Sequence, residues 1–523
     1  MRQFITKHER NIVGVLSGWD RIRFRGTIRT LAVTNMMTSW LWDRRVMLKH
    51  FKSFALELTA GLKASVEQVA GTAGRAVTYL ASSALSKEDL VRELIHREGI
   101  KEGLVCVLSC VEPCRSYDIH KNRETKHIEL VQCLRKCLHW YCYFLDPRLG
   151  LCHVRIQSWL PFNVHICVNG REWLCRSLEA AGIAFRRSDN CLVHVADVPA
   201  AGRLLFRQPW ANWQRILNGL VQRACPALCR LPGRDGPLSY YWSADETEWA
   251  TDVMFRSERA LAELYPSLIR HAMTTFSSRE VMRFLGRTRL PAGGGVDVRF
   301  NGQVTSDLSK RPEGLRIKHR MNHNSIKMYD KQGSVLRIET TINDARDLSV
   351  YRTTESDPQG DKKWQRLRKG VVDLPRRAEI SQSANGRYLT ALSEADAGIP
   401  LGKAADTIRR PVVRSTRRFR GLNPLSGPDA DLAAILLRGE FAIYGFRNRD
   451  IRLLLHRGTR SPEDQRRQSA QVSRLLRLFR EHRLIYKIKG THRYQLTAQG
   501  RRTLPAFIAA RNASTEQLNK LAA

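Results

Sequence analysis

The hydrophobic period of the chain changes from that of a helix to that of a strand between residues 461 and 497, and this change strongly constrains the fold. Ser461 offers a hydroxyl that can cap a helix N-terminus, and Pro462 and two acids follow, as is typical of a first helical turn. The apolar stripe then recurs at i, i+3, i+4 and i+7, at Val472, Leu475, Leu476 and Phe479. Residues 485–489 and 493–497 instead alternate with a period of two around a Gly-Thr turn. The segment therefore predicts a long helix followed by a short hairpin.

Basic side chains occupy the helix positions outside the apolar stripe and both strands of the hairpin: Arg467, Arg474, Arg477, Arg480, Lys487, Lys489 and Arg493. Residues 431–438 and 448–457 also have helical spacing, so two shorter helices are expected upstream. Over residues 427–505 this pattern resembles a winged helix-turn-helix domain of the MarR-like type. The resemblance implies a helix that enters the major groove of double-stranded DNA and a wing that lies along phosphates. The alternative is a helical tail whose arginines only contact solvent.

The charge of the whole chain indicates a polyanionic partner. Its 523 residues carry 87 Lys and Arg against 50 Asp and Glu, a net charge of +37. After residue 400 the counts are 26 and 9, a net charge of +17. We expect nucleic acid as the partner. The alternatives are an anionic membrane surface or high solubility alone, and a membrane is disfavoured because no amphipathic anchor with a large apolar face is visible.

The cysteines and the absence of an export signal favour a cytoplasmic protein. No leader-like apolar segment and no run long enough to span a bilayer is visible in the sequence. All 12 cysteines lie between Cys106 and Cys229, and reduced thiols are expected in that compartment. Pairs such as Cys133 and Cys137 are four residues apart and lack the Cys-x₂-Cys spacing of structural zinc. We therefore predict buried free thiols on helices and no zinc.

The order of predicted elements indicates an α+β protein of several domains. We expect a mixed N-terminal domain over residues 1–230, because a Pro/Gly-rich segment follows at 226–237. A central, basic domain rich in antiparallel β-structure is expected over 238–395, with helices at 244–264, 278–285 and 362–387 and a glycine-rich hinge at 291–295. A basic linker at 396–426, the winged domain at 427–505 and a tail at 506–523 complete the expected order.

The central domain contains a predicted three-stranded meander at residues 314–343 with one strongly basic face. Alternate positions carry Arg316, Lys318 and Arg320, then Lys327, Tyr329 and Lys331, then Arg337 and Glu339. A turn at 332–334 would place Tyr329 opposite Arg337 and Lys327 opposite Glu339. In one interpretation this half-exposed face binds phosphates, while Tyr329 stacks on a base or donates a hydrogen bond.

In the other interpretation the same face is a nuclease site. Tyr329 would be the nucleophile, with Lys327, Lys331 and Arg337 stabilising the phenolate and the phosphate. Glu339 would hold a divalent ion, Mg²⁺ or Mn²⁺. Both interpretations leave the central domain able to contact DNA or RNA.

Lys327-x-Tyr329-Asp330-Lys331, followed by Leu336-Arg337-x-Glu339, is similar to a stretch of the rolling-circle replication initiators of small plasmids and phages. The resemblance implies a tyrosine that attacks one DNA strand and a metal held by histidines and acids. The His-hydrophobic-His triplet of that superfamily is missing, and His165, in Asn163-Val164-His165, is the nearest match.

Two further groups of charged residues are candidates for chemistry or binding. The acids Asp245, Glu248 and Asp252 share one face if their segment is helical, and they could bind Mg²⁺ together with Glu339 or Glu313. The alternative is that they only complement the positive end of a helix dipole. A basic stretch with Trp364 would extend the phosphate-binding surface through Lys362, Lys363, Arg366 and Arg368.

The functional hypothesis is a DNA-binding protein of the mobile-element kind, related in mode to replication initiators and transposases. The winged domain would locate a site, and the central domain would grip or nick a strand there. A winged-helix transcriptional regulator without catalysis is the first alternative, and an RNA-binding protein is the second.

Overall fold

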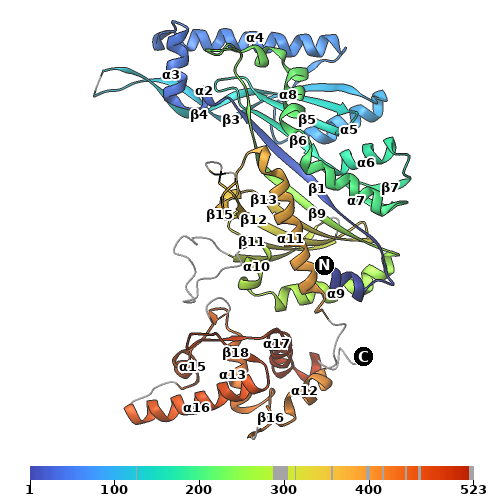
Figure 1. Cartoon of the computed structure of the whole chain (residues 1–523), viewed down its shortest axis with the longest axis vertical. Helices are drawn as coiled ribbons and strands as arrows, with labels where there is room; N and C mark the ends of the chain where they lie inside the picture. Colours follow the sequence, from blue (N-terminus) through green and yellow to red (C-terminus); the bar gives the residue numbers. More distant parts are fainter. Residues whose placement is uncertain are drawn as a thin grey trace. The chain divides into compact units, whose positions relative to one another are not determined.

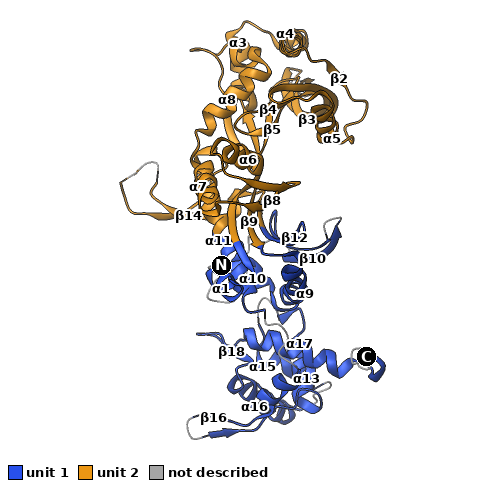
Figure 2. Cartoon of the chain, turned by 90° about the vertical axis from the view of Figure 1, so that its right-hand side faces the viewer, with its two compact units in different colours: residues 1–13, 255–338, 383–523 blue, residues 14–254, 339–382 orange. Residues whose placement is uncertain are grey.

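The chain folds into two compact units, each built from segments that are distant in the sequence (Figure 2). The structure, a computed structural model, describes residues 1–124, 126–286, 304–311, 314–354, 357, 359–395, 401–414, 417–441, 445–456 and 461–517. Unit 1 consists of residues 1–13, 255–338 and 383–523, and unit 2 of residues 14–254 and 339–382. The protein has the expected α+β character, with a large, mostly antiparallel sheet and many helices (Figure 1).

The strands of unit 2 form most of one twisted sheet. They are β1 (Ile12–Thr27), β2 (Val77–Tyr79), β3 (Gly103–Lys121), β4 (Ile128–Asp146), β5 (Gly150–Gln157), β6 (Val164–Asn169), β9 (Tyr241–Phe255) and the end of β13 (Val335–Ile342). Their order is β13-β9-β1-β6-β5-β4-β3-β2. Strands β1, β6, β5, β4 and β3 pair antiparallel, and β2 joins β3 in parallel.

The helices and small hairpins of unit 2 surround this sheet. The helices are α2 (Arg29–Ala32), α3 (Thr34–Asp43), α4 (Phe51–Thr72), α5 (Lys87–Glu98), α6 (Gly170–Ala180), α7 (Val198–Arg207) and α8 (Trp213–Ala224). The hairpins are β7 (Phe185–Ser188) with β8 (Cys191–Val195), and β14 (Ser349–Arg352) with β15 (Lys363–Arg366). Local signals explain several boundaries, as for α5, which Ser86 caps and which ends at Gly99 with φ of 64°.

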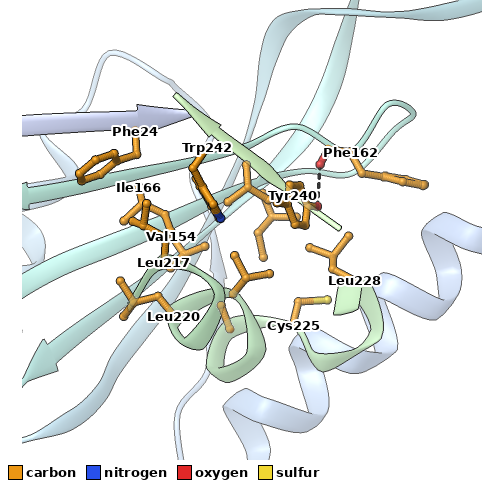
Figure 3. Packing of buried hydrophobic residues seen from close by; sticks show 14 of the residues in the cluster. Phe24, Val154, Phe162, Ile166, Leu217, Leu220, Cys225, Leu228, Tyr240 and Trp242 are labelled. Carbon is orange, nitrogen blue, oxygen red and sulfur yellow. Dashed lines mark hydrogen bonds between the residues drawn. The ribbon is translucent and has the colours of Figure 1, made fainter. Parts of the chain in front are cut away.

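The core of unit 2 lies between the sheet and helices α4 and α8 (Figure 3). Phe24, Val154 and Ile166 from the strands pack with Leu217 of α8, and each of these side chains is buried. Burial of one such side chain stabilises a fold by about 2 kcal/mol. The Tyr240 hydroxyl donates a hydrogen bond to the Phe162 carbonyl at 2.9 Å, and this bond offsets the unfavourable burial of the hydroxyl.

All 12 cysteines are free thiols, as predicted, but the predicted helices are wrong for the central ones. Cys106, Cys110 and Cys114 lie on β3, and Cys133 and Cys137 on β4. A spacing of four residues keeps side chains on one face of a strand as well as on one face of a helix. The spacing therefore could not distinguish the two elements.

Unit 1 contains a second group of strands and most of the C-terminal helices. Its strands are β10 (Val304–Arg311), β11 (Gly314–Met321), β12 (Asn324–Lys331), β13, β16 (Val412–Arg414), β17 (Arg417–Phe419), β18 (Ile485–Lys487) and β19 (Tyr494–Leu496). Its helices are α1 (Arg2–Lys7), α9 (Glu258–Thr275), α10 (Ser278–Phe284), the end of α11 (Leu374–Leu392), α12 (Leu401–Arg409), α13 (Gly427–Leu436), α15 (Asn448–Leu455), α16 (Pro462–Glu481) and α17 (Ala498–Asn512). Strands β10, β11, β12 and β13 are consecutive neighbours, which confirms the predicted meander.

The predicted helix at 244–264 is right only from Glu258, where α9 begins, because residues 241–255 form the strand β9. Thr247, Trp249, Thr251 and Val253 occupy alternate positions there, and β-branched and aromatic residues at a period of two favour a strand. The predicted helix at 362–387 is right only from Leu374, where α11 begins, and β15 precedes it.

The predicted domain boundaries also differ from the two units. The Pro/Gly-rich segment at 226–237 does not end a unit, because Leu228 and Leu231 belong to the same core as Trp242. The predicted linker at 396–426 contains α12 and the β16–β17 hairpin, and its Ile408 and Leu422 are buried in the C-terminal core. The predicted tail includes the end of α17, and the hinge at 291–295 lies outside the described residues.

Among the described residues, no helix combines the length and the apolar character needed to cross a bilayer.

Candidate nucleic-acid interface

Helix α16 follows the sequence prediction closely. The Ser461 hydroxyl accepts a hydrogen bond from the backbone N–H of Asp464 at 3.1 Å and caps the helix. The buried side is formed by Val472, Leu475, Leu476, Leu478 and Phe479. The four arginines predicted to lie outside the stripe, Arg467, Arg474, Arg477 and Arg480, are all exposed. One side of α16 is therefore core and the other is cationic.

Helix α15 is fixed against the first half of α16 by a small polar network. The Asn448 side-chain amide donates to the Ser469 carbonyl at 2.9 Å and to the Ser473 hydroxyl at 2.8 Å. The Ser469 hydroxyl donates back to the Asn448 side-chain oxygen at 3.1 Å. Because these bonds link one residue of α15 to two turns of α16, they set the direction in which the α16 arginines point.

The hairpin β18–β19 is extended by one residue that the sequence analysis missed. Phe446 pairs antiparallel with Tyr494, with hydrogen bonds of 3.0 and 2.8 Å between their backbones. Gly445 precedes it at a φ of 67°, and a Cβ atom there would lie 2.3 Å from the Tyr494 carbonyl oxygen. Only glycine suits that conformation and that close approach. Among the described residues, the order is α13, the bridge residue Phe446, α15, α16 and the β18–β19 hairpin.

The cations of α16 differ in what they contact. Arg480 pairs with Glu481 at 3.1 Å on the surface, and the Arg477 guanidinium lies 5.3 Å from the centre of the Phe419 ring. Arg467 and Arg474 have no acidic partner in the part of the chain that the structure describes. They are seven residues apart, two helical turns, and so lie on one side of the helix.

The predicted cations of the hairpin separate into two kinds. Lys487 and Lys489 are exposed. Arg493 is half-buried and donates to the Gly445 carbonyl at 3.4 Å, so it supports the fold of the hairpin. The exposed lysines are therefore the better candidates for contact with a phosphate backbone.

The cationic face of the meander is formed by β11 and β12. Lys318 lies directly opposite Lys327, and Arg316 and Arg320 are two residues away on the same face of β11. Like charges opposite each other destabilise a sheet. Burial, followed by the three neighbouring cations, lowers the pKa of Lys318, although Asp307, opposite it on β10, raises that pKa in part. An anion bound over this face would relieve that repulsion.

The residues of the predicted nuclease site are less accessible than expected. Tyr329 is 8% exposed, Arg337 is 1% exposed and Glu339 is 2% exposed, and β13 is buried along its length. The prediction of an open polar face is therefore wrong for the third strand. The described neighbour of Tyr329 on β11 is Arg316, and Lys331 is half-buried. A buried hydroxyl and carboxylate do not favour attack on a strand of DNA.

The predicted carboxylate cluster is not a cluster, because β9 is a strand. Each acid pairs with an arginine: Asp245 with Arg25 at 2.6 Å, Glu248 with Arg21 at 3.1 Å, and Asp252 with Arg171 at 2.9 Å. No group of three or more His, Cys, Asp or Glu among the described residues is arranged to hold a metal ion. The three acids, each paired with an arginine, do not form a Mg²⁺ or Mn²⁺ site together, and Glu313 lies outside the described residues.

His165, the predicted metal ligand on β6, lies among cations. Its Nδ1 atom is 3.2 Å from the Arg155 guanidinium. Arg25, on the neighbouring strand β1, lies directly opposite His165 in the strand register. Burial, followed by these arginines, lowers the pKa of His165 to about 3. Its neutral ring accepts a hydrogen bond from Arg155 and has no carboxylate partner among its described contacts.

The face of the unit 2 sheet on which α5 packs also carries a largely buried polar cluster that the sequence analysis missed. Glu112 on β3 accepts hydrogen bonds from the Tyr141 hydroxyl and from the Arg155 guanidinium, both at 2.6 Å. Lys87 is 3.5 Å away. The sequence shows polar residues alternating along β3, β4 and β5. It does not show that they meet, because Tyr141 and Arg155 are 29 and 43 residues from Glu112.

The basic residues around Trp364 lie on the β14–β15 hairpin. Lys362, Lys363 and Arg366 are exposed there. Arg368 is half-buried, and its backbone N–H donates to Asp373 at 2.9 Å. The three exposed cations are accessible to a ligand, and the Arg368 side chain is less so.

Comparisons of the chain with protein-family models, with curated proteins and with solved structures gave no match.

Proposed function

We propose that the chain is a DNA-binding protein whose residues 427–505 act as a winged helix-turn-helix domain. In this proposal α16 is the recognition helix, α15 supports it, and the hairpin β18–β19 is the wing. The observation that carries the proposal is the pair Arg467 and Arg474. They are exposed, share one side of a helix whose other side is buried, and have no described acidic partner.

Duplex DNA is the partner that this arrangement favours. The major groove of B-DNA admits an α-helix, whereas the major groove of A-form RNA is too deep and narrow for side chains to read. Lys487 and Lys489 on the hairpin would contact phosphates beside the groove. These contacts would position the helix, and the arginines of α16 would read base edges.

The meander supplies a second cationic surface for the phosphate backbone. Lys318 lies between Lys327 and Asp307 and has Arg316 and Arg320 nearby, so cations predominate on this face and a polyanion would interact with it favourably. The burial of Tyr329 and Glu339 favours binding over strand cleavage at this surface. A mobile-element role in which the protein nicks DNA therefore receives less support than binding.

Selection from a pool of random duplexes, followed by fluorescence anisotropy with the enriched sequence, tests the proposal. The double variant Arg467→Ala/Arg474→Ala is expected to bind that duplex about 30-fold more weakly or worse, since each lost contact costs about 1–3 kcal/mol. Its thermal unfolding should be unchanged, because both side chains are exposed.

Arg259→Ala is the matched control, because Arg259 is also a helical arginine of unit 1 and its side chain is 89% exposed. It should bind the duplex like the unaltered protein. Enrichment of no sequence, or equal losses in the control and the double variant, would contradict a recognition role for α16.

A further inference from the structure

The β14–β15 hairpin of unit 2 presents two large aromatic side chains to solvent. Tyr351 and Trp364 are opposite each other in register, with ring centres 5.5 Å apart and planes inclined by 50°. Their exposed fractions are 55% and 58%. In Figure 2 the hairpin projects from the rest of unit 2. A cross-strand pair of this kind stabilises its own hairpin, but that role needs only the contact between the rings.

Cationic side chains lie next to these rings. Arg366 is two residues from Trp364 along β15 and so on the same face, and Lys362 and Lys363 directly precede Trp364. All three are exposed. Aromatic rings beside cations fit a nucleic-acid strand, because bases stack on the rings while phosphates contact the charges. The same charges would be unfavourable against an apolar protein surface.

The hairpin is anchored in unit 2 on both sides of the aromatic pair. Val350 and Leu367 are buried in a small hydrophobic cluster. The Arg352 guanidinium donates to both Asp373 carboxylate oxygens, at 2.8 and 3.0 Å, and both side chains are largely buried. These contacts fix the backbone that carries the aromatic pair, which reduces the conformational entropy lost when a ligand binds.

We propose that Tyr351 and Trp364 form a stacking platform for the unpaired bases of a DNA strand, with Lys362, Lys363 and Arg366 contacting its phosphates. The choice of DNA rests on the proposed function, but the platform acts on single strands and not on the duplex that α16 would read. A wide, sequence-tolerant preference is expected, because every base presents an aromatic face.

The test is the binding of a labelled dT oligonucleotide of about 12 nucleotides to the full chain, followed by fluorescence anisotropy. Trp364→Ala and Tyr351→Ala are each expected to weaken binding roughly fivefold to a hundredfold. Trp364→Phe should retain most of the affinity, because a smaller ring still stacks. Binding of the blunt duplex selected through α16 should be unchanged in all three variants.

Trp210→Ala is the matched control, because Trp210 is another tryptophan of unit 2 and is 64% exposed. Dissociation constants for dT within about twofold of each other for the unaltered protein and the double variant Tyr351→Ala/Trp364→Ala would overturn the proposal. Equal weakening by Trp210→Ala, or binding of an rU strand but not of dT through this pair, would also overturn it. Failure of the duplex experiment alone would leave these results unaffected, so the two proposals fail separately.

Discussion

Glu112 on β3 is an acid whose environment strongly favours its charge. Burial opposes its ionisation, but hydrogen bonds from Tyr141 and Cys110 and the adjacent Arg155 outweigh burial and lower its pKa from 4.5 to about 2. A carboxylate with a lowered pKa contributes stability that is complete above its unfolded pKa. That contribution is lost as the pH falls from about 4.5 towards about 2. The protein is therefore expected to lose stability in this range partly through Glu112.

Replacing Glu112 with Gln is expected to cost about 1–3 kcal/mol at neutral pH, because buried partners lose a charged acceptor. The difference in free energy of unfolding between this variant and the unaltered protein should shrink below about pH 4. Urea unfolding at a series of pH values measures the free energy of unfolding of both proteins. Glu88→Gln is the control, because Glu88 is 60% exposed and its ion pair among the described residues is with Arg92, four residues on. An equal pH dependence in the Glu112 variant and the unaltered protein would show that the charge of Glu112 is not stabilising.

At the scale of the element, the meander combines a stable fold with an unfavourable charge. Because the pKa of Lys318 is lowered, its protonated form costs stability at neutral pH. Lys318→Gln is therefore expected to raise the free energy of unfolding by up to about 0.5 kcal/mol. The same variant should bind DNA more weakly and lower the salt slope of binding by about 1.

Thermal unfolding measures the stability of the Lys318→Gln variant, and fluorescence anisotropy measures its affinity for DNA. Lys310→Gln is the matched control, because Lys310 lies on the neighbouring strand opposite Leu315 and so on the other face. A destabilised Lys318 variant with unaltered DNA affinity would show that the face serves the fold and not a ligand.

Elements with strong local signals could be predicted from the sequence. The capping box of Ser277 and Glu280 marks the start of α10, and Ser461 marks the start of α16. β9 was missed because three acids at helical spacing obscured the alternation of Thr247, Trp249 and Thr251. The partners of those acids are arginines of β1 and α6, up to 227 residues away in the sequence, and no local pattern encodes such pairs.

For the whole molecule, breaks in composition were poor guides to the division into units. Segments rich in glycine, proline or arginine mark loops and turns, and a loop can lie within a unit as well as between two. Ile408 and Leu422 show this, because both are buried although the surrounding segment is basic. The cationic positions of the candidate recognition surface could be predicted because the helix and hairpin patterns lie within residues 461–497. The pairing of Phe446 with Tyr494 could not, since it joins residues across two intervening helices.

The central claim is that α16 docks its arginines onto a DNA duplex, and the salt dependence of duplex binding tests it most directly. The logarithm of the affinity is expected to fall linearly with the logarithm of salt concentration, with about 0.9 units of slope for each phosphate contact. For Arg467→Ala/Arg474→Ala the slope should be shallower by up to about 2, if both side chains lie against the DNA backbone as well as the base edges. An equal slope and equal affinity for this variant and the unaltered protein, or no duplex binding at moderate salt, would contradict the claim.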